Sequence, residues 1–251
     1  MTGLTGVLEV WAMELFLAAR GALFHGDAHE CPVCGMSVRA FTHGGGSLKP
    51  RIRGYCPRCN AKARHRRVWV HCQHHTDLFD RELRLLHVAP KYCLSRRITR
   101  MENVDYVAVD LAQRPHVTMI GDLTDLRLPN ESFDAILCVH VLEHIPDDRA
   151  AIAEMWRVLR AGGWAVVSVP LDLEAPTFED PSIVTPEDRR RSFGEADHVR
   201  VYGHDISKRF EAAGFQTELF RADALEGDVV DRYGLTLDEH VLMCTKPGGP
   251  R

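Results

Sequence analysis

Four cysteines with the spacing of metal ligands stand near the start of the chain. Cys31 and Cys34 form one C-x2-C pair, and Cys56 and Cys59 form a second pair after a gap of 21 residues. A tetrahedral zinc ion needs four ligands, and two such turns supply four thiolates. A site closed by four cysteines is structural, because no coordination position is left for water. We therefore predict a structural Zn2+ bound by these four cysteines in a zinc-ribbon module, with two short strands around the glycine-rich link 44–46.

A second metal site is the alternative for a neighbouring group of residues. His71, Cys72 and His75 follow closely along the chain, but only the two histidines share a helical face. Cys72 adjoins the apolar run 68–70. We favour surface histidines and a half-buried cysteine at this place.

The elements that follow residue 83 alternate between strand-like and helix-like runs, which is typical of a doubly wound parallel α/β sheet. The expected strands are 83–89, 104–110, 116–121, 133–139, 164–169, 215–221 and 240–246. The expected helices are 95–101, 147–160 and 205–213, and we expect Gly162 to cap the second of them.

Four stretches in this region carry a family resemblance. They are DLTDLRLP at 122–129, SFD at 132–134, VLEHI at 141–145 and VLRAGGW at 158–164. Their order and spacing resemble class I S-adenosylmethionine-dependent methyltransferases over about residues 83–246. The resemblance implies a Rossmann-like sheet of seven strands in the order 3-2-1-4-5-7-6, with strand 7 antiparallel. S-adenosyl-L-methionine would then lie across the carboxyl ends of strands 1 and 4.

The resemblance also implies which residues bind that cofactor. Asp110 ends the second strand, where an acid can accept hydrogen bonds from both ribose hydroxyls. Asp122 matches the family position that accepts from the adenine amino group, and Leu123 would cover the ring. The predicted cofactor-binding residues are His87, Val88, Ala89, Pro90, Asp110, Leu111, Asp122, Leu123, Val139 and His140.

The loop after the first strand departs from the family pattern. Methyltransferases usually carry an acid and then several glycines there, whereas this chain reads LHVAPKYC at 86–93, with His87 at the place of the acid. Ala89 is small, and Pro90 fixes the turn. An alternative reading is therefore a methyltransferase-like protein with altered or lost activity.

A segment of about 30 residues, 171–200, leaves the carboxyl end of the fifth strand, and we expect it to form a lid. Thr185 and Pro186 indicate the start of a helix within it. Transfer to a hydroxyl or a protonated amine needs a base, for which the candidates are His198, His144 and His140. Methyl transfer can also proceed by alignment alone.

The charge distribution bears on the acceptor. Of the 251 residues, 45% are hydrophobic and 26% are charged, which excludes a disordered chain. The net charge of −4 combines −3 over 1–30, −10 over 77–251 and nine Lys/Arg with no acid over 31–76. The favoured function is methyl transfer to an oxygen or nitrogen of a small-molecule biosynthetic intermediate. The alternative is an RNA methyltransferase whose basic module contacts phosphates, with Tyr55 and Trp69 stacking on bases.

The N-terminal segment is apolar at helical spacing, with Leu4, Val7, Leu8, Trp11 and Leu15 on one face. We expect this helix to dock on its own protein or on a second copy, which would give a homodimer. Acidic residues argue against a signal peptide or a membrane span. We therefore expect a cytoplasmic protein, in which the eight cysteines stay reduced and metal binding is favoured over disulfides. The predicted division is a helix over 1–24, a zinc-ribbon module over 25–76 and a methyltransferase domain over 77–251.

Overall fold

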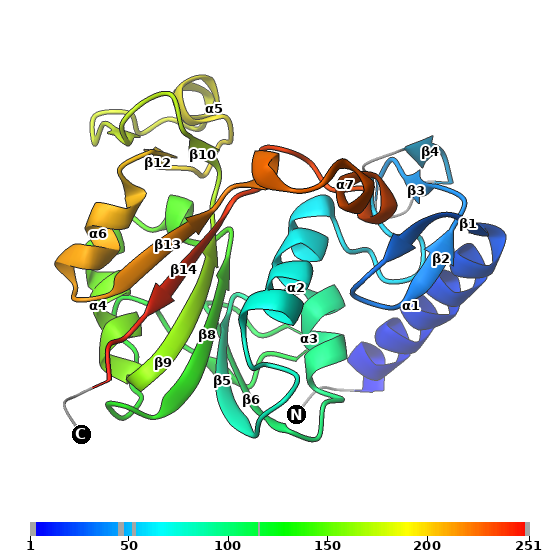
Figure 1. The fold of residues 1–251 in the computed structure, drawn as a ribbon, viewed down its shortest axis with the longest axis horizontal. Helices are drawn as coiled ribbons and strands as arrows, with labels where there is room; N and C mark the ends of the chain where they lie inside the picture. Colours follow the sequence, from blue (N-terminus) through cyan, green and yellow to red (C-terminus); the bar gives the residue numbers. More distant parts are fainter. Residues whose placement is uncertain (1–3, 45–47, 52–53, 115, 249–251) are drawn as a thin grey trace. The chain divides into compact units, whose positions relative to one another are not determined.

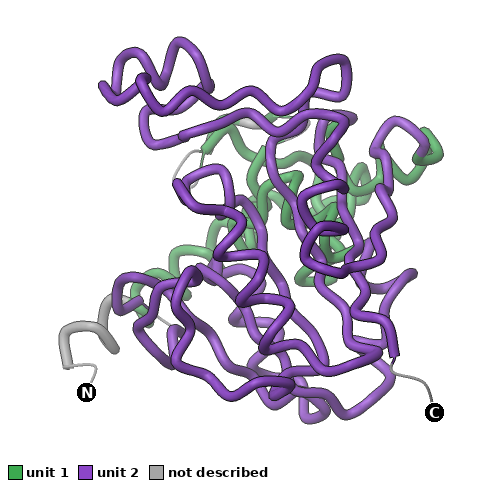
Figure 2. The backbone as a smooth tube through the Cα atoms, turned by 90° about the vertical axis from the view of Figure 1, so that its left-hand side faces the viewer, with its two compact units in different colours: residues 1–70, 225–236 green, residues 71–224, 237–251 purple. Residues whose placement is uncertain are grey.

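The computed structural model describes residues 4–44, 48–51, 54–114 and 116–248. The chain divides into two compact units, of residues 1–70 with 225–236 and of residues 71–224 with 237–251 (Figure 2). We call them unit 1 and unit 2. The segment 225–236 falls within the predicted methyltransferase domain yet belongs to unit 1. The three-part division made from the sequence stays a prediction.

Unit 2 contains a seven-stranded sheet in the order β13-β14-β9-β8-β5-β6-β7 (Figure 1). This is the predicted order 3-2-1-4-5-7-6 read from the other edge, so the fold class is confirmed. Strand β14 pairs antiparallel with both of its neighbours, and the other pairs are parallel. The strands are β5 (Leu83–Val88), β6 (Val104–Asp110), β7 (Met119–Ile120), β8 (Phe133–Val139), β9 (Leu159–Ser168), β13 (Gln216–Phe220) and β14 (Val241–Thr245).

Helices cover both faces of this sheet. In Figure 1, α3 (Tyr92–Ile98) lies on one side, and α4 (Asp148–Val158) and α6 (Ile206–Ala212) lie on the other. The α4 side is closed by one apolar core, to which α4 gives Ile152 and Met155 and α6 gives Phe210, all fully buried. Asp147 caps α4 by accepting a hydrogen bond from the Ala150 amide at 2.9 Å.

Two expectations about these elements were wrong. The third strand is only two residues long, and it pairs with β6 alone at the sheet edge. Gly162 does not cap α4: that helix ends at Val158, and the extended backbone of the buried Leu159 begins β9 directly. Gly162 lies inside β9, with a φ of +78°, and its amide donates to the Lys246 carbonyl.

The predicted lid contains β10 (Leu171–Asp172), β11 (Phe178–Glu179) and α5 (Pro186–Phe193), and β10, β11 and β12 (Arg200–Gly203) form a small sheet. Thr185 caps α5 as expected, since its hydroxyl accepts from the Asp188 amide.

Buried polar groups join the lid to the loop that follows η1 (Leu142–His144). The Arg200 guanidinium is 4% exposed and donates to the carbonyls of Leu142 and Pro146 at 3.0 and 2.7 Å. The Tyr202 hydroxyl donates to Asp148 at 2.7 Å, and burial raises the Tyr202 pKa. Because unpaired buried charges are costly, this network fixes the η1 loop against the lid.

Unit 1 is built around the four cysteines. It contains α1 (Leu4–Leu23), the hairpin of β1 (His25–Cys31) with β2 (Met36–Val38), and the pair β3 (Phe41–Thr42) with β4 (Pro50–Arg51). It also contains α7 (Gly227–Tyr233) and most of α2 (Ala63–His75), along which the unit boundary falls. The tip at 45–47, Ile52 and Arg53, and the side chains of Leu4, Val7 and Leu8 lie outside the described residues.

Two buried arginines hold unit 1 together. Arg20 of α1 donates to the Pro57 carbonyl at 2.8 Å and also contacts Asn60, so the helix docks on its own chain. Arg66 donates to carbonyls on both sides of it, including Gly54 at 3.0 Å and Tyr233 at 2.7 Å. Because a guanidinium presents a rigid fork of donors, Arg66 bridges the four-cysteine region and α7.

This packing corrects three expectations drawn from the charged module. Arg66 and Arg67 are buried, so they are not available to phosphates. Trp69 is only 4% exposed and cannot stack on a base. His71 is fully buried rather than on the surface, because its ring packs against His75 and Phe220, and Cys72 beside it is fully buried too.

No helix in the described part of the chain combines the length and the apolar character that a membrane span needs.

Candidate functional site

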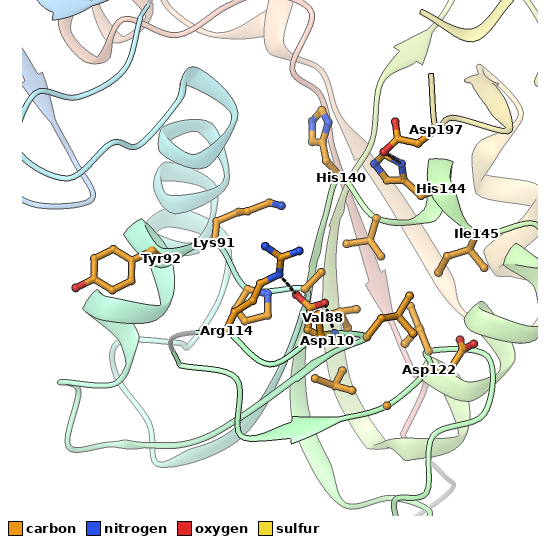
Figure 3. A pocket seen from close by; sticks show the side chains of 18 residues that line it. Val88, Lys91, Tyr92, Asp110, Arg114, Asp122, His140, His144, Ile145 and Asp197 are labelled. Atoms are coloured by element: carbon orange, nitrogen blue, oxygen red, sulfur yellow. Dashed lines mark hydrogen bonds and ion pairs between the residues drawn. The ribbon is translucent and has the colours of Figure 1, made fainter. Parts of the chain in front are cut away.

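A cavity of about 670 Å3 opens in unit 2 where four parallel strands end. Its wall includes the residues directly after β5, the end of β6, the turn after β7 and the residues after β8 (Figure 3). Of the residues predicted to bind cofactor or to act in catalysis, those on this wall are Val88, Ala89, Pro90, Asp110, Leu111, Asp122, Leu123, His140 and His144.

Asp110 stands at the end of β6 with its carboxylate toward the cavity. Oδ1 accepts a hydrogen bond from the Ala112 amide at 3.1 Å, and Oδ2 lies 3.3 Å from Nε of Arg114. Arg114 is 63% exposed, so it can move away from the carboxylate without unpacking any core. Leu111 beside it is 74% exposed, an apolar side chain open to the cavity.

Asp122 follows β7 and makes a local turn. Its Oδ1 accepts from both the amide and the hydroxyl of Thr124 at 2.9 Å. The other carboxylate oxygen, Oδ2, remains available as a hydrogen-bond acceptor beside the cavity. The neighbouring Leu123 also lines the cavity and is 4% exposed. The two acids therefore flank a part of the wall that also carries Leu111.

The loop after β5 makes its sharp turn without a glycine. Ala89 adopts a φ of +44°, in the left-handed region that favours glycine, and its amide donates to the Val109 carbonyl at 2.7 Å. The side chain of Ala89 is small, so the backbone of the loop lies close to the cavity. Lys91 and Tyr92 add a cation and an aromatic ring to the wall. Backbone held in this region is a feature of functional loops.

His87 does not reach the cavity, although it stands at the place of the family's acid. Alternate residues of a strand face opposite sides, and the His87 ring lies on the side of Tyr106, whose hydroxyl is 3.0 Å from Nδ1. Burial, and then the nearby Lys91 charge, lower the His87 pKa from 6.5 to about 3. The prediction of His87 as a cavity residue was wrong for this reason.

Three histidines and three carboxylates gather beyond β8, and sequence reasoning found only the histidines. His140 has a φ of +53° and lies 3.1 Å from Glu239 through Nε2 and 3.2 Å from Glu143 through Nδ1. His144 lies 3.3 Å from Asp197 (Figure 3). His198 comes from the end of the lid, with its ring 4.7 Å from that of His144.

Besides His87, two further predicted residues lie off the wall. Val139 is 2% exposed within β8, and His198 is 8% exposed behind His144. Sequence reasoning missed Lys91, Arg114 and Asp197 on the wall. Asp197 adjoins His198 in the sequence, which is the one signal that could have found it.

In unit 1 the four predicted cysteines come together. Sγ of Cys31 lies 3.7 Å from Sγ of Cys59, and the same distance separates Cys34 from Cys56. Tetrahedral bonds of about 2.3 Å to zinc place neighbouring sulfurs about 3.8 Å apart, so the cluster fits this ion. Asn60, directly after the second pair, has a φ of +61°, and its amide donates to the Cys56 carbonyl.

Comparison with known proteins agrees with this architecture. Residues 85–167 match the methyltransferase domain family. A protein of Mycolicibacterium smegmatis named "Probable S-adenosylmethionine-dependent methyltransferase" is 30% identical over 124 residues. That match covers 47% of this chain and 44% of the relative, so the chain spans less than half the length of this curated relative.

Two solved structures share the fold. The [4+2]-cyclase SpnF has a TM-score of 0.54 at 19% identity, over 86% of this chain and 91% of its own. The 1,6-didemethyltoxoflavin N1-methyltransferase of Burkholderia thailandensis has a TM-score of 0.50 at 18% identity, over 74% of this chain and 78% of its own. Unit 2 therefore has the fold of these structures, and residues 85–167 within it match the methyltransferase domain family.

The buried His87 makes a prediction about pH. Its pKa is lowered on folding, so neutral His87 contributes stability above pH 6.5 that is lost as the pH falls toward 3. At pH 5 the loss is about 2 kcal/mol. The variant His87→Gln keeps a hydrogen-bonding group for Tyr106 but has no imidazole to protonate. Urea unfolding at pH 7 and at pH 5 gives the fall in unfolding free energy between the two pH values. This fall should be smaller in the variant than in the unsubstituted protein by about 2 kcal/mol. An unchanged fall would contradict the buried, neutral imidazole.

Proposed function

We propose that the protein transfers the methyl group of S-adenosyl-L-methionine to an oxygen or nitrogen of a small molecule. The observation that supports this most is the convergence of Asp110, Asp122, Ala89 and His140 on one cavity at four strand ends. In a doubly wound sheet this is the crevice in which nucleotide cofactors bind. The domain match and the shared fold point to the same chemistry.

The residues of the cavity fit the parts of this cofactor. Asp110 would accept from the ribose hydroxyls once Arg114 moves aside, Leu111 and Leu123 would contact the adenine, and Asp122 would accept from its amino group. The left-handed Ala89 would bring the β5 loop against the methionine part. The bound cofactor supplies a methyl group on a cationic sulfur, which is reactive toward nucleophiles without further activation.

The chain's own task is to position the acceptor and to keep water out. The lid 171–200 supports a small acceptor, because its Asp197 lines the cavity and its Arg200 donates to the Leu142 carbonyl of η1, the element that carries His144. A base role for His140, His144 or His198 stays a prediction. The burial of Arg66, Arg67 and Trp69 takes two of the nine basic residues and one of the two stacking candidates away from the case for RNA as the acceptor.

A second function within the same fold has one observation in its favour. SpnF, which shares the fold over most of both chains, is named as a [4+2]-cyclase. A protein of this architecture can therefore carry a different activity. Cofactor binding without methyl transfer to any acceptor would favour this alternative.

The four-cysteine cluster supports a structural zinc ion, which we propose as the second cofactor. Its sulfur–sulfur distances fit tetrahedral coordination, and Cys31, Cys56 and Cys59 are buried within unit 1. No coordination position would remain for a reactant.

The role of Asp110 can be tested by calorimetric titration with S-adenosylhomocysteine. Asp110→Asn replaces a charged acceptor by a neutral one, so the Kd should rise about tenfold. The matched control is Asp105→Asn on the same strand, whose carboxylate is 67% exposed and pairs with Arg84; its Kd should not change. No binding by the intact protein would overturn the proposed function, and an unchanged Kd in Asp110→Asn would overturn the ribose contact.

The zinc proposal can be tested with protein produced in cobalt-supplemented medium. Four thiolates around Co2+ should give sulfur-to-cobalt charge-transfer absorption, and Cys56→Ser should weaken it. Cys72→Ser is the control, because Cys72 is equally buried but lies outside the cluster. Absence of this absorption in the unsubstituted protein, or equal loss in both variants, would contradict the assignment.

A further inference from the structure

A histidine–carboxylate cluster at the edge of the cavity has the composition of a metal site. Glu143 and His144 of η1 and His198 of the lid each offer one ligand atom, and these atoms lie within 4.8 Å of one another. Two imidazoles with one carboxylate form a ligand set that divalent transition-metal ions use, with further coordination positions left open. We propose that Glu143, His144 and His198 bind one divalent metal ion, separate from the four-cysteine site.

The hydrogen bonds of the two histidines leave one ring nitrogen of each available. His198 Nδ1 lies 3.2 Å from the Phe193 carbonyl oxygen, which can only accept, so Nδ1 carries the hydrogen and Nε2 keeps its lone pair. His144 Nδ1 lies 3.3 Å from an oxygen of Asp197, and an ionised carboxylate fixes the same tautomer. Metal-binding histidines are oriented by such contacts to a carbonyl or a carboxylate.

Glu143 gives an independent reason to place a cation here. Its side chain is 1% exposed, and neither carboxylate oxygen has a hydrogen-bond partner among the described residues. His140 Nδ1 lies 3.2 Å from Oε1, but its Nε2 faces Glu239, so one imidazole stands between two carboxylates. Because Glu143 shares this one imidazole with Glu239, its buried charge is poorly compensated, and a bound divalent cation would offset the cost.

The position of the cluster suggests what the ion would do. His144 and Asp197 line the cavity, and the His144 side chain is 37% exposed, so the open coordination positions would face the acceptor end. An ion with open positions binds molecules that offer two adjacent oxygens, such as a vicinal diol or an α-hydroxy acid. This role in acceptor binding rests on the proposed function, whereas the binding of metal does not.

The test uses the intact, zinc-loaded protein and Mn2+ alone as the probe. Mn2+ prefers oxygen and nitrogen ligands and does not compete for four thiolates, so the zinc site is left undisturbed. The free Mn2+ signal in electron paramagnetic resonance should fall with a stoichiometry of one ion per chain. Glu143→Gln should weaken binding at least tenfold. The control Glu195→Gln, an exposed carboxylate of the same lid, should bind as the unsubstituted protein does.

A second variant keeps the test decisive if Glu143→Gln fails to fold. His144→Gln changes a partly exposed side chain and should weaken Mn2+ binding by a similar factor. The proposal is overturned if the unsubstituted protein binds no Mn2+ at millimolar concentration, or if Glu143→Gln and His144→Gln bind as Glu195→Gln does. Titration of the same samples with S-adenosylhomocysteine separates the two hypotheses: cofactor binding without Mn2+ binding rejects the metal site alone, and the reverse rejects the proposed function alone.

Discussion

The reversal of strand order at β5 is the constraint on which the site depends. From β5 the sheet continues through β6 and β7 in one direction and through β8 and β9 in the other. Helices must then cross to opposite faces, so the loops after β5 and β8 separate and leave a crevice at their carboxyl ends. Ala89 and His140, the residues that begin these two loops, both have positive φ. Both residues line the cavity, so the backbone turns at its edge on each side.

The site also depends on the lid, which buried polar groups hold in place. The buried guanidinium of Arg200 and the buried carboxylate of Asp148 would each be costly if unpaired, and each finds its partners across the junction of lid and η1 loop. The lid is therefore fixed at its base, which brings His198 against His144. Glu143, the carboxylate of the proposed metal site, is positioned by the same junction, since the Val199 amide donates to the Glu143 carbonyl.

Much of this could be predicted from the sequence. The alternation of apolar runs, with the ordered motifs of the resemblance, predicts the sheet order, and strand-end placement predicts Asp110.

The departures have local physical causes. Side chains alternate between the two faces of β5, so His87 points away from the cavity. No motif of the family predicts its contact with Tyr106. Glu143 lies inside a quoted motif, but no motif shows that its carboxylate is buried close to His198 of the lid. The membership of 225–236 in unit 1 depends on contacts such as Arg66 with Tyr233, distant in sequence.

The most direct test of the central claim is a crystal structure of the protein with S-adenosylhomocysteine. We expect the ribose hydroxyls on the Asp110 carboxylate with Arg114 displaced, the adenine beside Leu111 and Asp122, and the amino-acid part against Ala89. The sulfur would point toward His140 and His144. A ligand bound elsewhere, or in this cavity with no contact to Asp110 and Ala89, would contradict the proposed cofactor site.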